Sequence, residues 1–169
     1  NKQNSIVSSV FSQAPDWAEY YKIFIKETAE KYHNIVLDTA LLNEDTTQSS
    51  VYLLFNSADR NKVEVGDVLS LKKEHGTNNA VIDKATWKIL DIQGAASLGE
   101  DEDGVTTNVV TIGSSTIEQS VITNPAQLNG KFFVKVLYDD DFINNIGDLS
   151  AAEGLSSLNG AVFETKKSS

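Results

Sequence analysis

Apolar and polar residues alternate at every second position in several stretches of this chain. In residues 20–27 the side chains of Tyr21, Ile23 and Ile25 fall on one face, and that face is wholly apolar. Tyr20, Lys22, Phe24 and Lys26 fall on the other face. Similar runs of β-branched and aromatic residues follow at 35–42, 51–55, 68–72, 86–92, 105–112 and 132–138. Each run predicts a β-strand.

Turn-forming residues separate these runs. Examples are Asn43-Glu44-Asp45, Gln93-Gly94 and Asn129-Gly130. Short strands at such spacing are typical of an antiparallel sandwich or barrel and not of alternating βα units. We therefore predict a mainly β protein.

Two stretches favour a helix instead. Pro15 suits the first position of a helical turn over 15–19. Ser115 and Glu118 have the spacing of a capping box, which predicts a helix over 114–122. A strand explains the apolar residues of that second stretch equally well, so both alternatives stay open.

The pair Gly66-Asp67 predicts a tight turn leading into the strand at 68–72, an arrangement that is common in small β-barrels. We therefore divide the chain near residue 58. Residues 1–58 form a sandwich-like unit that is partial, and 59–146 form a small barrel-like unit. From Gly147 onward Ser, Ala, Gly and Leu follow without a clear period, which predicts a linker or lightly packed tail over 147–169.

Composition narrows the classes of function. The 169 residues include 24 acidic and 14 basic ones, for a formal net charge of −10. Repulsion from phosphates argues against a nucleic-acid partner and against a membrane surface. Cysteine is absent, so neither disulfides nor thiolate metal sites form, and no run of about 18 apolar residues predicts a membrane span. Because methionine is also absent, we expect a processed product or a piece of a longer polypeptide.

Two acidic runs are candidate cation sites. The run Glu100-Asp101-Glu102-Asp103 precedes Gly104, but the order of an EF-hand fails because Gly99 and Val110 would occupy its first and twelfth positions. A solvated turn is the favoured interpretation, and an irregular calcium site is the alternative. The run Asp139-Asp140-Asp141 is treated in the same way. We predict no metal site and no cofactor.

Catalytic motifs are missing from the sequence. His33 and His75 are the only histidines, and they lack the spacing that places two imidazoles around one zinc ion. Neither a GxSxG elbow nor a glycine-rich phosphate loop is present. We predict that the protein is not an enzyme. A pair of distant carboxylates, as in a glycosidase, is the enzymatic alternative.

Three residues are candidates for an interaction surface. Trp17 and Tyr20 are aromatic residues near the first predicted strand, and such rings can stack on sugars or anchor a protein partner. Arg60 lies in the polar loop 59–62, where it either pairs with nearby acids or anchors an interface. For the other aromatics, such as Tyr21, burial in a core is the favoured interpretation.

Four segments in order resemble large virion structural proteins of tailed phages, in particular those of marine and related environmental phages. They are APDWAEYYKIFIKE (14–27), FNSADRNKV (55–63), LSLKKEHG (69–76) with KILDI (88–92), and NGKFFVKV (129–136). The pattern of that class commonly continues after KILDI into an acidic, proline-containing stretch, whereas this chain has QGAAS at 93–97.

The resemblance implies a non-enzymatic virion component of the tail or its fibre-bearing parts. It also implies fibronectin-like and small-barrel β-modules, with other virion subunits as partners. It supplies no catalytic residues. The alternative function is a carbohydrate-binding or receptor-binding adhesin module, for which Trp17 and Tyr20 would be stacking rings and a host-surface glycan the partner.

Overall fold

The computed structural model describes residues 15–17, 32–73, 85–150 and 160–167. Its elements are β1 (Tyr32–Asn43), β2 (Ser50–Asn56), the 3-10 helix η1 (Ser57–Lys62), β3 (Val68–Lys73), β4 (Thr86–Lys88), β5 (Asp91–Gln93), β6 (Ala96–Glu100), β7 (Thr106–Ile112), β8 (Ser115–Glu118), the 3-10 helix η2 (Pro125–Leu128), β9 (Lys131–Leu137), α1 (Asp140–Asn145) and β10 (Val162–Lys166). The mainly β, antiparallel fold expected from the sequence is confirmed.

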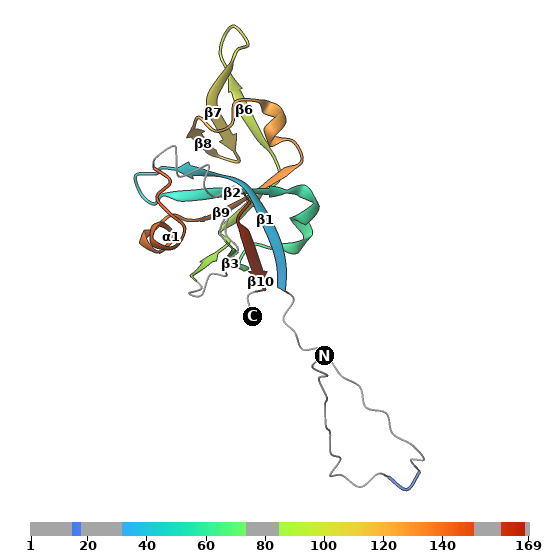
Figure 1. Cartoon of the computed structure of the whole chain (residues 1–169). Coiled ribbons are helices and arrows are strands. Elements are labelled where there is room, and N and C mark those ends of the chain that lie inside the picture. The colour runs from blue at the N-terminus through green and yellow to red at the C-terminus, as the bar shows by residue number, and fades with distance from the viewer. Residues whose placement is uncertain (1–14, 18–31, 74–84, 151–159, 168–169) are drawn as a thin grey trace, which may run out of the picture.

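A seven-stranded antiparallel sheet forms the body of the molecule (Figure 1). Its order is β4-β3-β10-β1-β2-β9-β5, so β4 and β5 are its two edges. The same two strands are consecutive in the chain, and only Ile89 and Leu90 separate them. Ile89 N donates to Asp67 O at the start of β3, and Leu90 N donates to Lys135 O on β9, both at 2.8 Å. The sheet therefore closes on itself, and we call it the barrel.

Two bends divide the barrel into halves that face each other like the layers of a sandwich. One is the break between β4 and β5, where the sequence predicted a single strand over 86–92. The other is a bulge in β1, where the pairing register shifts between Leu37 and Thr39. Residues 32–36 pair with β10, whereas Leu37 and residues 39–43 pair with β2. Bulges bend a strand in this way, which allows one strand to serve both halves.

The barrel interior is filled by large apolar side chains. Phe55, Phe132 and Phe163 are fully buried there, and Trp87 packs edge-on against Phe142 with ring centroids 5.6 Å apart. Phe142 comes from α1, so this short helix closes part of the barrel core. Together these rings supply much of the hydrophobic stabilisation.

Strand β10 corrects the tail predicted for 147–169. Val162–Lys166 pairs with β1 on one side and β3 on the other, and Phe163 lies in the barrel core. The strand has only five residues, and its buried positions are Phe163 and Thr165, so the apolar pattern was too brief to stand out beside the preceding Ser, Gly and Leu residues. Strand pairing likewise crosses the boundary predicted near residue 58, because β2 pairs with β9 and β1 pairs with β10.

A second, three-stranded antiparallel sheet packs on the outside of the barrel (Figure 1). We call this sheet, in the order β6-β7-β8, the outer sheet. Its Leu98, Val110, Ile112 and Ile117 contact the outward side chains of barrel strands, in particular Tyr52 of β2. Tyr52 also shares a 3.0 Å hydrogen bond between its hydroxyl and Ser115 Oγ. Strand β2 is therefore buried on both faces, which explains its almost continuous apolar run.

Local turn chemistry was predicted in part. The Gly66-Asp67 turn is confirmed: Asp67 N donates to Glu64 O at 3.1 Å, and Gly66 has φ of +94°, which a residue with a Cβ rarely adopts. Of the two alternatives left open for 114–122, the strand is found at Ser115–Glu118, which is β8, and the helix is not. A capping box does occur nearby, between Asn124 and Gln127 at the start of η2.

Candidate interaction site

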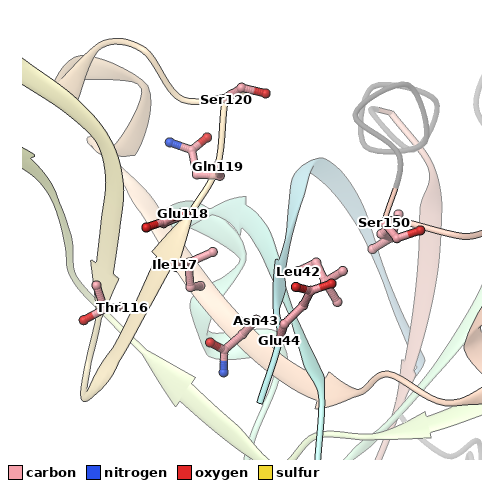
Figure 2. A pocket seen from close by; sticks show the side chains of 10 residues that line it. Leu42, Asn43, Glu44, Thr116, Ile117, Glu118, Gln119, Ser120 and Ser150 are labelled. Atoms are coloured by element: carbon pink, nitrogen blue, oxygen red, sulfur yellow. The ribbon is translucent and has the colours of Figure 1, made fainter. Parts of the chain in front are cut away.

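A cleft lies between the outer sheet and one end of the barrel. It has a volume of about 510 Å³ and is open to solvent on one side. We call it the β8 cleft, and Figure 2 shows side chains from β8 on one side and from the end of β1 on the other. Its lining residues are Leu42, Asn43, Glu44, Thr116, Ile117, Glu118, Gln119, Ser120, Leu149 and Ser150.

The lining of the β8 cleft is apolar at its base and acidic at its edge. Ile117 and Leu149 are buried, and Leu42 is half-buried. Glu44 and Glu118 are exposed, one from each side of the cleft. This combination suits a partner segment that is apolar on one face and basic on the other.

Gln119 fixes the wall of the cleft directly after β8. This buried side chain donates through Nε2 to Ile122 O at 2.9 Å, and its Oε1 accepts from Ile122 N at 2.6 Å. Its backbone N also donates to Asn108 O of β7 at 2.9 Å. The wall is therefore held by hydrogen bonds from within the outer sheet, and it is formed before any partner arrives.

A second cleft, of about 380 Å³, lies beside the bulge of β1. Lys131 Nζ forms a 2.9 Å ion pair with Asp38 Oδ2 across it. Thr39 Oγ1 is buried and has no hydrogen-bond partner in the described part of the chain. Thr39 lines this cleft together with residues of the segment 121–129.

The first acidic run forms the tip of the β6–β7 hairpin. Asp101 Oδ1 accepts from Asp103 N at 3.0 Å and from Val105 N at 2.8 Å, so this carboxylate shapes the turn. All four acidic residues of the run are exposed. These bonds are the ordinary ones of an aspartate-led turn.

The second acidic run begins helix α1. Asp139 is the N-cap, and its Oδ1 accepts from Phe142 N at 2.9 Å. Asp140 and Asp141 occupy the first turn, where the helix dipole favours negative charge. A capping interpretation was available from the sequence, because an aspartate three residues before a buried aromatic is a common helix start. Within the described residues, no three His, Asp or Glu side chains cluster closely enough to hold a metal ion.

The three predicted interaction residues do not come together in the described structure. Trp17 lies in the segment 15–17 and is 83% exposed, while Tyr20 lies outside the described residues. Arg60 is exposed in η1, and its Nη1 donates to Val63 O at 2.9 Å. Arg60 therefore helps to end η1, and its positive charge contributes to lowering the pKa of Glu64.

Charged groups also gather where β10 ends. Lys167 Nζ lies 2.8 Å from Glu64 Oε1 and 3.7 Å from Asp67 Oδ2. The hydrogen bond from Lys167 lowers the pKa of Glu64, and the bond to Glu64 raises the pKa of Lys167. The exposed Glu64 and the buried Asp67 both attach the end of β10 to the turn before β3 through Lys167.

The two histidines do not contribute to the β8 cleft. His33 lies opposite Thr165 of β10, in the half of β1 before the bulge, and His75 is outside the described residues. The sequence did not reveal the cleft itself. Its two sides come from segments more than 70 residues apart, around Leu42 and Thr116, and no local pattern marks residues that meet only in the tertiary structure.

Comparison with known proteins gave no match. No protein-family model, curated protein or solved structure matches this chain. In the part of the chain that the structure describes, no helix has the length and apolar character needed to cross a membrane.

Proposed function

We propose that this chain is a non-enzymatic structural module of a tailed-phage virion, in the tail or its fibre-bearing parts. In this role it holds other virion subunits in place. The virion setting rests on the four resembling segments. The observation that carries the contact role is the β8 cleft, with its apolar base and acidic edge, on the outside of a closed barrel.

Wherever the resembling segments fall on strands of the structure, these strands belong to the barrel and not to the outer sheet, which supports a scaffold role for the barrel and a contact role for the outer sheet. The described parts of the resembling segments lie at the end of β2 with η1, in β3, in β4 with β5, and in β9, which are all parts of the barrel. The outer sheet lies between residues 92 and 129, outside those segments. A barrel that serves as scaffold and an added sheet that provides the contact surface fit a module repeated in varied form within large structural proteins.

The net charge of −10 supports protein partners over nucleic acid or a membrane surface. The test is mass spectrometry of purified phage particles that carry this sequence, combined with lysine cross-linking. We expect peptides of the chain in the particles and cross-links to other structural proteins. Detection in the infected-cell lysate but not in purified particles would overturn the proposal.

A second candidate, the adhesin module, is favoured by one observation, the 83% exposure of Trp17. An exposed indole can stack on a sugar ring. Glycan arrays with the intact chain and with Trp17→Ala, each with and without calcium, test this function. Binding that disappears in the variant supports it, and arrays without signal under both conditions reject it.

A further inference from the structure

Strand β8 has one unpaired edge. In the β7–β8 pairing, Ile117 lies opposite Val110 and Thr116 lies opposite Thr111. Gln119 N donates to Asn108 O, and hydrogen-bonding direction alternates along an antiparallel strand. Ser115, Ile117 and Gln119 therefore bond to β7, whereas the backbone N–H and C=O groups of Thr116 and Glu118 point away from it. In the described part of the chain no third strand pairs with this edge.

The unpaired edge of β8 borders the β8 cleft. Thr116 and Glu118 line the cleft, together with Ile117, whose side chain lies on the barrel-facing side of the outer sheet. A strand added to β8 would therefore have one face toward the apolar base at Leu42 and Leu149. Its other face would lie beside the exposed carboxylate of Glu118.

We propose that the β8 cleft binds residues 20–27 of a second copy of this chain, which add a strand to β8. The inference rests on the proposed function, for which it names the partner and the surface. The segment alternates in the way the cleft requires: Tyr21, Ile23 and Ile25 form one apolar face, and the other face carries Lys22 and Lys26 together with Tyr20 and Phe24. The apolar face covers the base of the cleft, and the lysines lie next to the carboxylates of Glu118 and Glu44.

The length of the chain favours a second copy over the same molecule. The cleft begins at Leu42, ten residues along β1 from Tyr32, and a strand of that length covers at most about 33 Å, less the shortening caused by the bend at the bulge. The start of β1 lies at the far end of the barrel from the outer sheet (Figure 1). Four residues separate Glu27 from Tyr32, and the five Cα–Cα steps between these two residues span at most about 18 Å, which is too short for residues 20–27 to lie along β8 of their own molecule.

The first test removes the edge donor. Thr116→Pro deletes an outward N–H of β8, at an edge position where proline is tolerated. The matched control is Ala96→Pro, on the opposite edge of the same sheet, where Ser97 pairs with Thr111 and Ala96 points outward. Sedimentation equilibrium should show self-association of the intact chain, about tenfold weaker association for Thr116→Pro, and unchanged association for Ala96→Pro.

The second test reverses charge, with the fold of each variant checked by circular dichroism. Glu118→Lys should weaken association, and combining it with Lys22→Glu and Lys26→Glu should restore it. A merely structural role of Glu118 would give no such rescue. Equal association of all these variants would contradict the proposal.

The third test identifies the occupant and uses the absence of cysteine in the chain. Thr116→Cys and Lys22→Cys are made in separate copies, which are mixed and oxidised. We expect disulfide-linked dimers of the two different copies, and few when Val105→Cys, at the exposed β6–β7 hairpin, replaces Thr116→Cys. When both substitutions are in one chain, a predominantly intramolecular disulfide would overturn the second-copy assignment.

A purified chain that stays monomeric at all concentrations, or dimers that neither Thr116→Pro nor the cysteine pair affects, would overturn this inference. The particle test of the proposed function is independent of those outcomes. If the chain is cross-linked only to other virion proteins, the proposed function stands, but the binding of residues 20–27 of a second copy to the β8 cleft is rejected.

Discussion

The barrel and the outer sheet are built from the same kinds of residue but differ in how their edges end. In the barrel, β4 and β5 are consecutive, so the two edges of the sheet meet and the core is enclosed on all sides. The outer sheet has three strands, two open edges, and an apolar cluster on one face only, completed by side chains of β1, β2 and β9. Closure gives stability, and open edges leave backbone groups for a partner.

This difference predicts that the two regions respond differently to the loss of apolar volume. Phe163→Ala removes a fully buried ring between Phe55 and Trp87, whose centroids lie 6.1 and 6.4 Å away. We expect a loss of about 3–5 kcal/mol in the free energy of unfolding, measured by urea denaturation. Val162→Ala, half-buried on the same strand, is the control and should have a smaller effect. A negligible loss for Phe163→Ala would show that β10 is as lightly packed as the sequence suggested.

The corresponding change in the outer sheet is Ile112→Ala, which also removes a fully buried side chain. We expect a loss of about 2–3 kcal/mol, because an open sheet relaxes into the cavity more easily than a closed barrel does. Hydrogen exchange should be faster in β6, β7 and β8 and unchanged in β10. Equal acceleration in both regions would mean that they unfold as one unit.

Gly99 tests the packing inside the outer sheet. It lies where the β6–β7 register shifts, and a Cβ there would be 2.6 Å from Thr107 Oγ1. Gly99→Ala should cost about 1–3 kcal/mol in thermal unfolding. The double variant with Thr107→Ala should recover part of that loss, since the next atom, Val109 O, is 3.4 Å away. Without recovery, the contact with Thr107 is not the cause.

Asp139 tests the helix that covers the barrel core. Asp139→Ala removes the carboxylate that accepts from Phe142 N, and we expect a loss of about 1 kcal/mol in unfolding free energy. Asp140→Ala, exposed in the first turn, is the control and should change stability by a few tenths of a kcal/mol. Equal effects of the two substitutions would contradict the capping role.

The smallest effect concerns pH. The Tyr138 hydroxyl donates to Asp148 Oδ1 at 2.7 Å, and burial together with this bond raises the pKa of Tyr138 above its ordinary value of 10.0. A raised pKa in the folded state means that the stabilisation is present below pH 10 and is lost as the pH rises through the folded-state pKa. Tyr138→Phe should therefore flatten the alkaline limb of the stability curve. If Tyr138→Phe leaves the alkaline part of the stability curve unchanged, titratable groups other than Tyr138 determine the loss of stability at high pH.

Among the described residues, the longer runs of β-branched and aromatic residues predicted strands correctly, whereas the run 20–27 lies outside the described residues. Runs 35–42, 51–55, 68–72, 105–112 and 132–138 each overlap a strand of the structure. The failures have local physical reasons. Helix and strand stayed equally open over 114–122 because β8 has only four residues beside a capping pattern, and β10 was missed because it lies next to a polar, glycine-containing stretch.

The sequence by itself determined the β class, the Gly66-Asp67 turn and the acidic character, because these depend on neighbouring residues and on composition. Only the tertiary structure decided that β4 and β5 close the barrel, that β10 lies between β1 and β3, and that Leu42 meets Ile117 at the β8 cleft. Each of these depends on pairing between residues far apart in the chain. Such pairing is chosen by the burial of whole faces, which no short stretch of sequence specifies.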